Sequence, residues 1–161
     1  AFGGTVRRVG ATALGVALLA VTLLVFAPTT GYDVVGFDDE RFIVNNPHLQ
    51  RGLDRESLRF ALFGVRSSNW HPLTWLSFAI DVERGGMHPG SFHATNVALH
   101  LLNVLLVFAV LARGTGAMLP AALVAALFAW HPLHVEPVAW ISERKELLAA
   151  TFGLLAIAAY L

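Results

Sequence analysis

The densest group of residues able to do acid–base chemistry lies in GYDVVGFDDERFIVNNPH, residues 31–48. It contains three adjacent carboxylates, Asp38, Asp39 and Glu40, which are followed by Arg41 and flanked by aromatic residues. A carboxylate at an apolar boundary beside a cation can act as a general base, and such a cluster could also bind a divalent cation. A solvated loop accounts for the same residues. Their spacing alone does not choose between these alternatives.

A second polar group lies in AWHPLHVEPVAWISERKELL, residues 129–148. His131, His134 and Glu136 are metal-ligand types, but the prolines between them break the regular helix that an H-E-x-x-H zinc site requires. Aromatic and histidine side chains are also at home at a membrane interface. A basic pair beside carboxylates suits an anionic headgroup such as a lipid phosphate. These residues are Arg144, Lys145 and Glu146.

The phrase WHPL occurs twice, at residues 70–73 and 130–133. The first copy opens a short amphipathic segment and the second closes an apolar run, so the contexts do not indicate a duplication. In both copies proline restricts the preceding residue to extended backbone, which places His71 and His131 at turns of the chain. We expect both histidines to approach one pocket together with the acidic segment.

The composition is typical of a membrane protein. Of 161 residues, 56% are hydrophobic and 14% are charged, and the mean hydropathy is +0.63. Soluble domains carry about a quarter charged residues. The net charge is zero and the basic residues form no run, so nucleic acid is not an expected partner. The absence of cysteine excludes disulfide and thiolate chemistry. We interpret the chain as part of a larger membrane protein.

Apolar segments of spanning length predict an all-α fold, a polytopic membrane helical bundle with four transmembrane helices. The segments cover about residues 9–27, 94–112, 114–130 and 147–161. A cleaved signal peptide is the alternative interpretation of the first segment. Arg7, Arg8 and Arg113 would share one side of the membrane, which the positive-inside rule makes cytoplasmic.

The long connection, residues 28–93, would face outward and should contain two helices. Asp54 fits the N-cap of the first helix and Gly64 its end. Pro72 suits the first position of the second helix, which a glycine pair would end. Both helices are too short to span a bilayer, so we expect them to lie in its interface.

Three polar residues interrupt the second apolar segment. Asn96, His100 and Asn103 follow i, i+4, i+7 and therefore share one helical face. Polar groups inside a membrane normally pair with other helices, so we expect these side chains to hold helices together. An ion or proton pathway along this face is the alternative.

Four phrases, in this order, resemble one known family: FDDERFIVNNPH, NWHPLTWLS, FHATNVALHLLN and ALFAWHPLHVEPVAWISERKELL. They are similar to the amino-terminal membrane region of the transmembrane and tetratricopeptide-repeat O-mannosyltransferases and their bacterial relatives. More distantly, they resemble the GT-C glycosyltransferases. The resemblance covers most of the chain from Tyr32 onward. It implies a polytopic helical fold with an acidic motif and two juxtamembrane helices in the first outer loop, and a carboxy-terminal helical repeat domain.

The resemblance also implies inverting transfer of a sugar from a polyprenyl-phosphate donor to a hydroxyl of a protein or glycan. The reaction would take place on the extracytoplasmic face of a bacterial inner membrane. Asp38 and Asp39 fall on the diacidic motif, Asp38 as the candidate base and Asp39 as its companion, while Glu40 leaves the choice of base open. Arg144 would contact the donor phosphate, and Glu146 would orient that contact.

No cofactor is expected to be required, although a divalent cation could bind. The other residues expected near the substrates are Glu40, Arg41, His71, His131, His134, Glu136 and Lys145. The competing hypothesis is a non-catalytic membrane scaffold whose outer loop binds a partner. It predicts that the acidic pair and Arg144 tolerate substitution, whereas the apolar face around Trp75 and Phe78 does not.

Overall fold

A computed structural model of the chain describes residues 2–66 and 68–161, with side chains from Val9 onward. The side chains of Arg7 and Arg8, which contribute to the predicted orientation, lie outside the described residues. Among the residues described there is no β-strand, and a single isolated antiparallel bridge joins Arg66 and Asn69. The α-helices are α1 (Phe2–Phe26), α2 (Arg55–Phe63), α3 (Pro72–Gly85), α4 (Pro89–Thr115), α5 (Met118–Trp130), α6 (Val135–Ala139) and α7 (Arg144–Tyr160). The shorter helical turns are η1 (Ala27–Gly31), η2 (Glu40–Val44), η3 (Pro132–His134) and η4 (Ile141–Glu143), of which η2 is π-helical.

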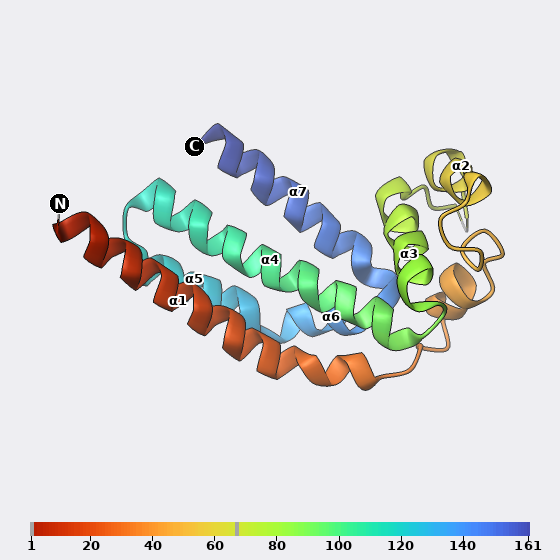
Figure 1. The fold of residues 1–161 in the computed structure, drawn as a ribbon, viewed down its shortest axis with the longest axis horizontal. Coiled ribbons are helices and arrows are strands. Elements are labelled where there is room, and N and C mark those ends of the chain that lie inside the picture. The colour runs from red at the N-terminus through yellow and green to blue at the C-terminus, as the bar shows by residue number, and fades with distance from the viewer. Residues whose placement is uncertain (1, 67) are drawn as a thin grey trace.

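The long helices form an elongated bundle, and the two loop helices gather at one end of it. Helix α4 packs against α1, α5 and α7, and so occupies the centre of the bundle (Figure 1). Helices α2 and α3 pack on each other at the end of the bundle where α7 begins (Figure 1). The segment that carries the acidic residues lies at this same end, between η1 and α2.

The apolar helices are those of a multi-pass membrane protein. Two segments of the described chain are long and apolar enough to cross a membrane, Val9–Gly31 and Pro89–Thr115. A third span would form if α5 and the following segment, Pro132–Ala139, count as one helix bent by 54°. Helix α7 has 17 residues and lies where the fourth span was expected. Four spans, and a bilayer interface around α2 and α3, stay predictions.

Local sequence signals explain where the loop helices begin and end. The Asp54 side chain accepts a hydrogen bond from the Ser57 backbone N–H at 2.6 Å, which caps α2. Helix α3 begins at Pro72, which has no N–H to leave unpaired, and Gly86 follows its end with φ +62°. Helix α4 begins at Pro89, five residues before the expected start of the second span at about residue 94, and the ring of His88 accepts the Gly90 N–H at 3.1 Å at this helix start.

An apolar cluster joins the loop to the bundle. Trp75 and Phe78 from α3 are buried in it with Phe92 from α4. Ile43 from η2 and Ile141 from η4 are fully buried in the same cluster, although they lie far apart in sequence. This packing brings the acidic segment against the short turn that precedes α7.

The polar face of α4 holds helices together, as its spacing predicts. Asn96 donates to the carbonyl oxygens of Val138 and Trp140, at 3.4 and 3.2 Å. The ring of His100 hydrogen-bonds the Ala129 carbonyl at 3.0 Å. Asn103 donates to the Leu147 carbonyl at 2.9 Å and accepts from Thr151 at 2.7 Å. All three side chains of this face are buried.

Candidate functional site

Asp39 is the anchored member of the acidic pair. Its side chain is fully buried, and both of its carboxylate oxygens accept hydrogen bonds. The Val35 N–H donates to Oδ2 at 3.0 Å, and the Ser142 N–H donates to Oδ1 at 2.9 Å. The Ser142 hydroxyl donates to the same Oδ1. A buried carboxylate requires such donors, so Asp39 joins the long loop after α1 to the turn before α7.

Asp38 differs sharply from its neighbour. Its side chain is only partly buried, and within the described residues no group hydrogen-bonds its carboxylate. Glu40 and Arg41 follow in η2 and are exposed. The Arg41 carbonyl accepts from Arg66 Nε at 2.7 Å, which fixes the backbone of η2. Among these carboxylates, Asp38 and Glu40 are open to a bound molecule, whereas Asp39 is not.

Arg144 is completely buried and hydrogen-bonded within the protein. Its Nη1 lies 2.6 Å from Asp81 Oδ2 and donates to Ser77 Oγ at 3.1 Å. Its Nε donates to Asn96 Oδ1 at 2.7 Å, and its Nη2 donates to the Phe92 carbonyl at 2.8 Å. The guanidinium also lies over the Phe78 ring, 4.4 Å from its centre. Arginine stays protonated in proteins, so this group is a charge that ties α7 to α3 and α4. Its predicted contact with a donor phosphate stays a prediction.

Sequence reasoning singled out Asn96 but missed two other partners of Arg144, Ser77 and Asp81. Asp81 is 3% exposed in the middle of α3, and its Oδ1 accepts from the Thr95 hydroxyl at 2.6 Å. The signal was present, because Thr74, Ser77 and Asp81 follow i, i+3, i+7 and form a polar stripe beside the apolar face of α3. Ser142, which contacts Asp39, had no comparable local signal.

His93 is a further buried polar residue that the sequence did not single out. It is 1% exposed, and neither ring nitrogen has a hydrogen-bond partner among the described residues. Its ring lies edge-on to Tyr32, with ring centres 6.3 Å apart. It is also within electrostatic range of Asp39 and Arg144. His93 thus packs against Tyr32 and directly follows Phe92, whose carbonyl accepts from Arg144.

The first WHPL copy lines a groove between α3 and α7. The cavity has a volume of about 220 Å³. His71 and Lys145 supply polar groups, and the residues that line it with them are Trp70, Pro72, Leu73, Thr74, Leu148, Ala149 and Phe152. Lys145 Nζ lies 2.6 Å from Glu143 Oε1. The lysine that lines the groove is therefore half of a partly exposed ion pair. The Trp70 indole donates to the Leu62 carbonyl at 3.0 Å, which holds this copy to α2.

The second WHPL copy lies beside a different cavity. His134 and Glu146 help to line it, its volume is about 260 Å³, and Asn103 and Phe128 lie in its wall. The His131 ring accepts the Leu133 N–H at 3.2 Å and lies edge-on to His134. Within the described chain neither the His71 ring nor the His131 ring contacts Asp38 or Asp39. Their convergence on one substrate pocket stays a prediction. Glu136 is exposed in α6.

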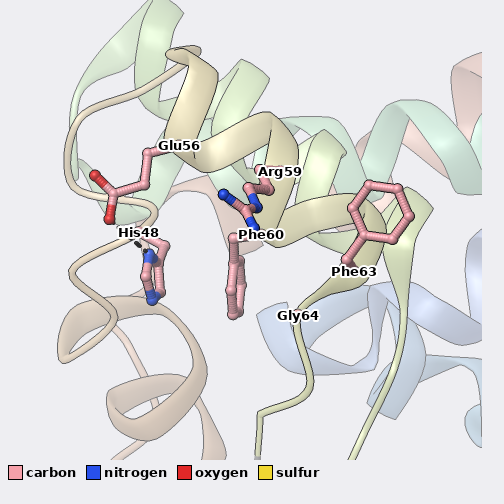
Figure 2. A pocket seen from close by; sticks show the side chains of 6 residues that line it. All are labelled: His48, Glu56, Arg59, Phe60, Phe63 and Gly64. Carbon is pink, nitrogen blue, oxygen red and sulfur yellow. Dashed lines mark ion pairs between the residues drawn. The ribbon is translucent and has the colours of Figure 1, made fainter.

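A larger pocket of about 440 Å³ lies on α2, and Figure 2 shows the side chains around it. The rings of His48 and Phe60 stack with centres 4.4 Å apart. The Glu56 carboxylate lies 3.5 Å from the His48 ring, and Arg59 and Phe63 project from the same helix (Figure 2). None of the acidic-pair residues lines this pocket.

No three carboxylate or imidazole groups converge in a way that could hold a metal ion, among the residues described. The need for a metal or another cofactor is therefore still a matter for prediction. The groups available for chemistry are two accessible carboxylates, Asp38 and Glu40, beside the anchored Asp39, and a separate, largely apolar groove that Lys145 lines.

Comparison with known proteins identifies relatives of the chain. No protein-family model matches it, and no solved structure does. It is 40% identical over 162 residues to protein O-mannosyl-transferase TMTC4 of Homo sapiens, a match that covers 88% of the chain and 22% of that protein. It is 38% identical over 135 residues to TMTC1 of Mus musculus, covering 76% of the chain and 14% of that protein.

Drosophila melanogaster Tmtc2 is 34% identical over 151 residues, covering 88% of the chain and 16% of that protein. The chain thus spans about a fifth or less of the length of the relatives it matches. The matches extend over most of this chain and all carry the same family name, so the chain belongs to the TMTC family of protein O-mannosyl-transferases.

Proposed function

We propose that the chain is part of a membrane glycosyltransferase in which Asp38 is the general base. The observation that carries the proposal is the division of the acidic pair. Asp39 is buried with both oxygens hydrogen-bonded, whereas Asp38 is partly exposed and its carboxylate accepts no hydrogen bond from the described residues. A base must reach the proton that it removes, and this arrangement favours Asp38.

The reaction is a single displacement that inverts the configuration of the sugar. The Asp38 carboxylate takes the proton of the acceptor hydroxyl as its oxygen bonds to the anomeric carbon. The bond from that carbon to the phosphate oxygen breaks, and the polyprenyl phosphate leaves with the electron pair. Since phosphate is a good leaving group, this step needs no protonated carboxylic acid, unlike the two-carboxylate glycosidases. A nearby cation would stabilise the departing negative charge.

The groove beside the first WHPL copy supports a donor that is both apolar and anionic. Its walls are largely apolar, and Lys145 and His71 face the same space. An isoprenoid chain requires apolar walls, whereas its phosphate requires a cation or hydrogen-bond donors. Lys145 is partly exposed and Arg144 is fully buried. In this conformation Lys145 is therefore the better candidate for contact with the phosphate.

The names of the relatives support mannose as the sugar and a protein as the acceptor. We propose that the acceptors are serine or threonine hydroxyls of a protein and that the transfer takes place on the extracytoplasmic face of a bacterial inner membrane. The acidic segment belongs to the long connection between the two apolar helices of spanning length. The positive-inside rule places Arg113, at the other end of α4, on the cytoplasmic side, so this connection would lie on the extracytoplasmic face.

The test uses the full-length protein, undecaprenyl-phosphate mannose as the donor and a serine- and threonine-containing peptide as the acceptor. Asp38→Asn should lower kcat by at least about 100-fold, since it removes the base and preserves the shape of the side chain. Asp33→Asn is the matched control, because Asp33 is an exposed carboxylate of the same segment and lies outside the acidic pair. Undiminished transfer by Asp38→Asn would remove Asp38 as the base and point to Glu40, which is also exposed. No transfer by the unaltered full-length protein would overturn the proposed activity and leave the non-catalytic scaffold as the better account.

A second experiment tests the donor groove. Lys145→Gln should raise KM for the lipid-linked donor and leave KM for the peptide unchanged, because the cation meets only the phosphate. Arg84→Gln is the control, since Arg84 is an exposed cation in the last turn of α3 and does not line the groove. Equal effects of the two substitutions would remove Lys145 from the donor site.

A further inference from the structure

Ser142 donates two hydrogen bonds to one oxygen of Asp39. Its backbone N–H and its hydroxyl both donate to Asp39 Oδ1, across 103 residues of sequence. The Val35 N–H donates to the other oxygen, Oδ2, and this hydrogen bond closes a small loop from Val35 to Asp39. Asp38 lies within this loop, one residue before the anchored carboxylate. Successive Cα atoms are about 3.8 Å apart, so fixing Asp39 limits where Asp38 can be.

The turn that carries Ser142 is itself fixed on both sides. Ile141 precedes it and is fully buried in the apolar cluster with Ile43 and Trp75. Arg144 follows it, with hydrogen bonds or an ion pair to α3 and α4. An apolar anchor and a charged anchor thus hold η4 against the bundle. The position of Ser142 is therefore set by the same contacts that join α7 to α3 and α4.

We propose that Ser142 is a positioning residue for the transfer reaction, acting through Asp39 to place Asp38. This inference rests on the proposed function, since it concerns the same acidic pair. It assigns different roles to two adjacent carboxylates: Asp39 holds the loop and Asp38 takes the proton. It also gives Arg144 a role that needs no contact with substrate, namely to keep the Ser142 turn in place.

The test compares substitutions in the full-length protein under the mannose-transfer assay described above. Ser142→Ala removes one of the two donors, and we expect kcat to fall by about 10- to 100-fold with KM for both substrates little changed. Ser142→Thr keeps the hydroxyl and should restore most of the lost kcat. If Ser142 were only structural, Ser142→Ala would lower the amount of folded enzyme. The kcat per folded molecule would then be the same for Ser142→Ala and Ser142→Thr.

Ser57 provides a matched control. Its N–H donates to one oxygen of an aspartate, Asp54 Oδ1, at 2.6 Å, and its hydroxyl lies 2.8 Å from the same oxygen and 2.6 Å from the His48 carbonyl, between which its single hydrogen is shared. Ser57 is buried like Ser142, but Asp54 caps α2 and is not part of the acidic pair. Ser57→Ala should leave kcat unchanged. An equal fall in kcat for Ser57→Ala and Ser142→Ala would overturn the inference.

The outcomes separate this inference from the proposed function. Transfer that is abolished by Asp38→Asn and unaffected by Ser142→Ala would overturn the role of Ser142 and leave Asp38 as the base. Transfer that survives Asp38→Asn would overturn the role of Asp38 as the base, and no transfer by the unaltered protein would overturn the function itself. An effect of Ser142→Ala on KM alone would assign Ser142 to substrate binding and also contradict the positioning role.

Asp39→Asn keeps the inference testable if Ser142→Ala does not fold. An amide oxygen can still accept both Ser142 donors, although it cannot act as a base. The amide nitrogen would then face the Val35 N–H and lose that hydrogen bond, so only part of the clamp is kept. The positioning role predicts that Asp39→Asn retains part of the transfer that Asp38→Asn abolishes. Equal abolition by the two substitutions would contradict the division of roles between the two carboxylates.

Discussion

Two serine–aspartate clamps with the same donors lie in very different parts of the molecule. Ser57 donates to Asp54 from three residues away, at the start of an exposed loop helix. Ser142 donates to Asp39 from 103 residues away, in the buried junction between loop and bundle. The first clamp shapes one helix end and, through the His48 carbonyl that the Ser57 hydroxyl also contacts, reaches only nine residues along the chain. The second sets the position of a whole segment.

The difference shows that burial and sequence separation, more than hydrogen-bond chemistry, decide what a clamp does. Where water can replace a lost donor, a hydrogen bond contributes little net free energy. Where water is excluded, an unpaired carboxylate costs far more. The Ser142–Asp39 pair, here called the inner clamp, should therefore be sensitive to substitution. The Ser57–Asp54 pair, the outer clamp, should tolerate it.

Removing the charged support behind the inner clamp should have the largest effect. Arg144→Met leaves Asp81 buried without its cation, and we expect the free energy of unfolding to fall by about 3–5 kcal/mol. Chemical unfolding of the full-length protein in detergent micelles measures it. Arg144→Met combined with Asp81→Leu should recover most of the loss, because no charge then remains unpaired. A double variant no more stable than the single one would contradict this explanation.

Removing one donor from each clamp compares them directly. Ser142→Ala should cost about 1–3 kcal/mol in the free energy of unfolding, because the buried Asp39 carboxylate loses a partner that water cannot replace. Ser57→Ala should cost about 1 kcal/mol, the net worth of an ordinary hydrogen bond. The same unfolding experiment measures both, and equal costs would show that burial does not distinguish the clamps.

Acid should release the outer clamp. Hydrogen bonds from the Ser57 backbone and then from its hydroxyl lower the pKa of Asp54 from its usual 3.8. Because the folded pKa lies below the unfolded one, the stabilisation is complete above about pH 3.8 and is lost as the pH falls through the folded value. Amide hydrogen exchange at the start of α2 should accelerate over that range. Asp54→Asn, which caps without titrating, should abolish the acid dependence of exchange there.

The smallest effect is expected at the exposed ion pair beside the outer clamp. Arg51 Nη1 lies 3.0 Å from Glu56 Oε2, and the two side chains are 67% and 58% exposed. Glu56→Gln should change the free energy of unfolding by less than about 1 kcal/mol, and high salt should erase the difference. A loss comparable to that of Arg144→Met would remove the contrast between the two regions.

The sequence predicted the features that depend on neighbouring residues. Asp54 and Pro72 mark helix starts because capping is local, and the polar face of α4 follows from helical spacing. The pairing of Asp39 with Ser142 could not be predicted, because it depends on how a loop folds back onto a distant turn. Asp81 differs, because helical spacing places it on a polar stripe of α3 but does not tell that this stripe is buried against Arg144.

Asn96 has a consequence for which substitutions the protein can accept. Its oxygen accepts from Arg144, while its nitrogen donates to two carbonyls in the chain between α5 and α7. Aspartate at this position would keep the acceptor and lose the donor, leucine would lose both, and glutamine would carry the same amide one methylene too far. We therefore expect saturation mutagenesis to find asparagine nearly irreplaceable here, while the exposed positions of α2 accept many residues.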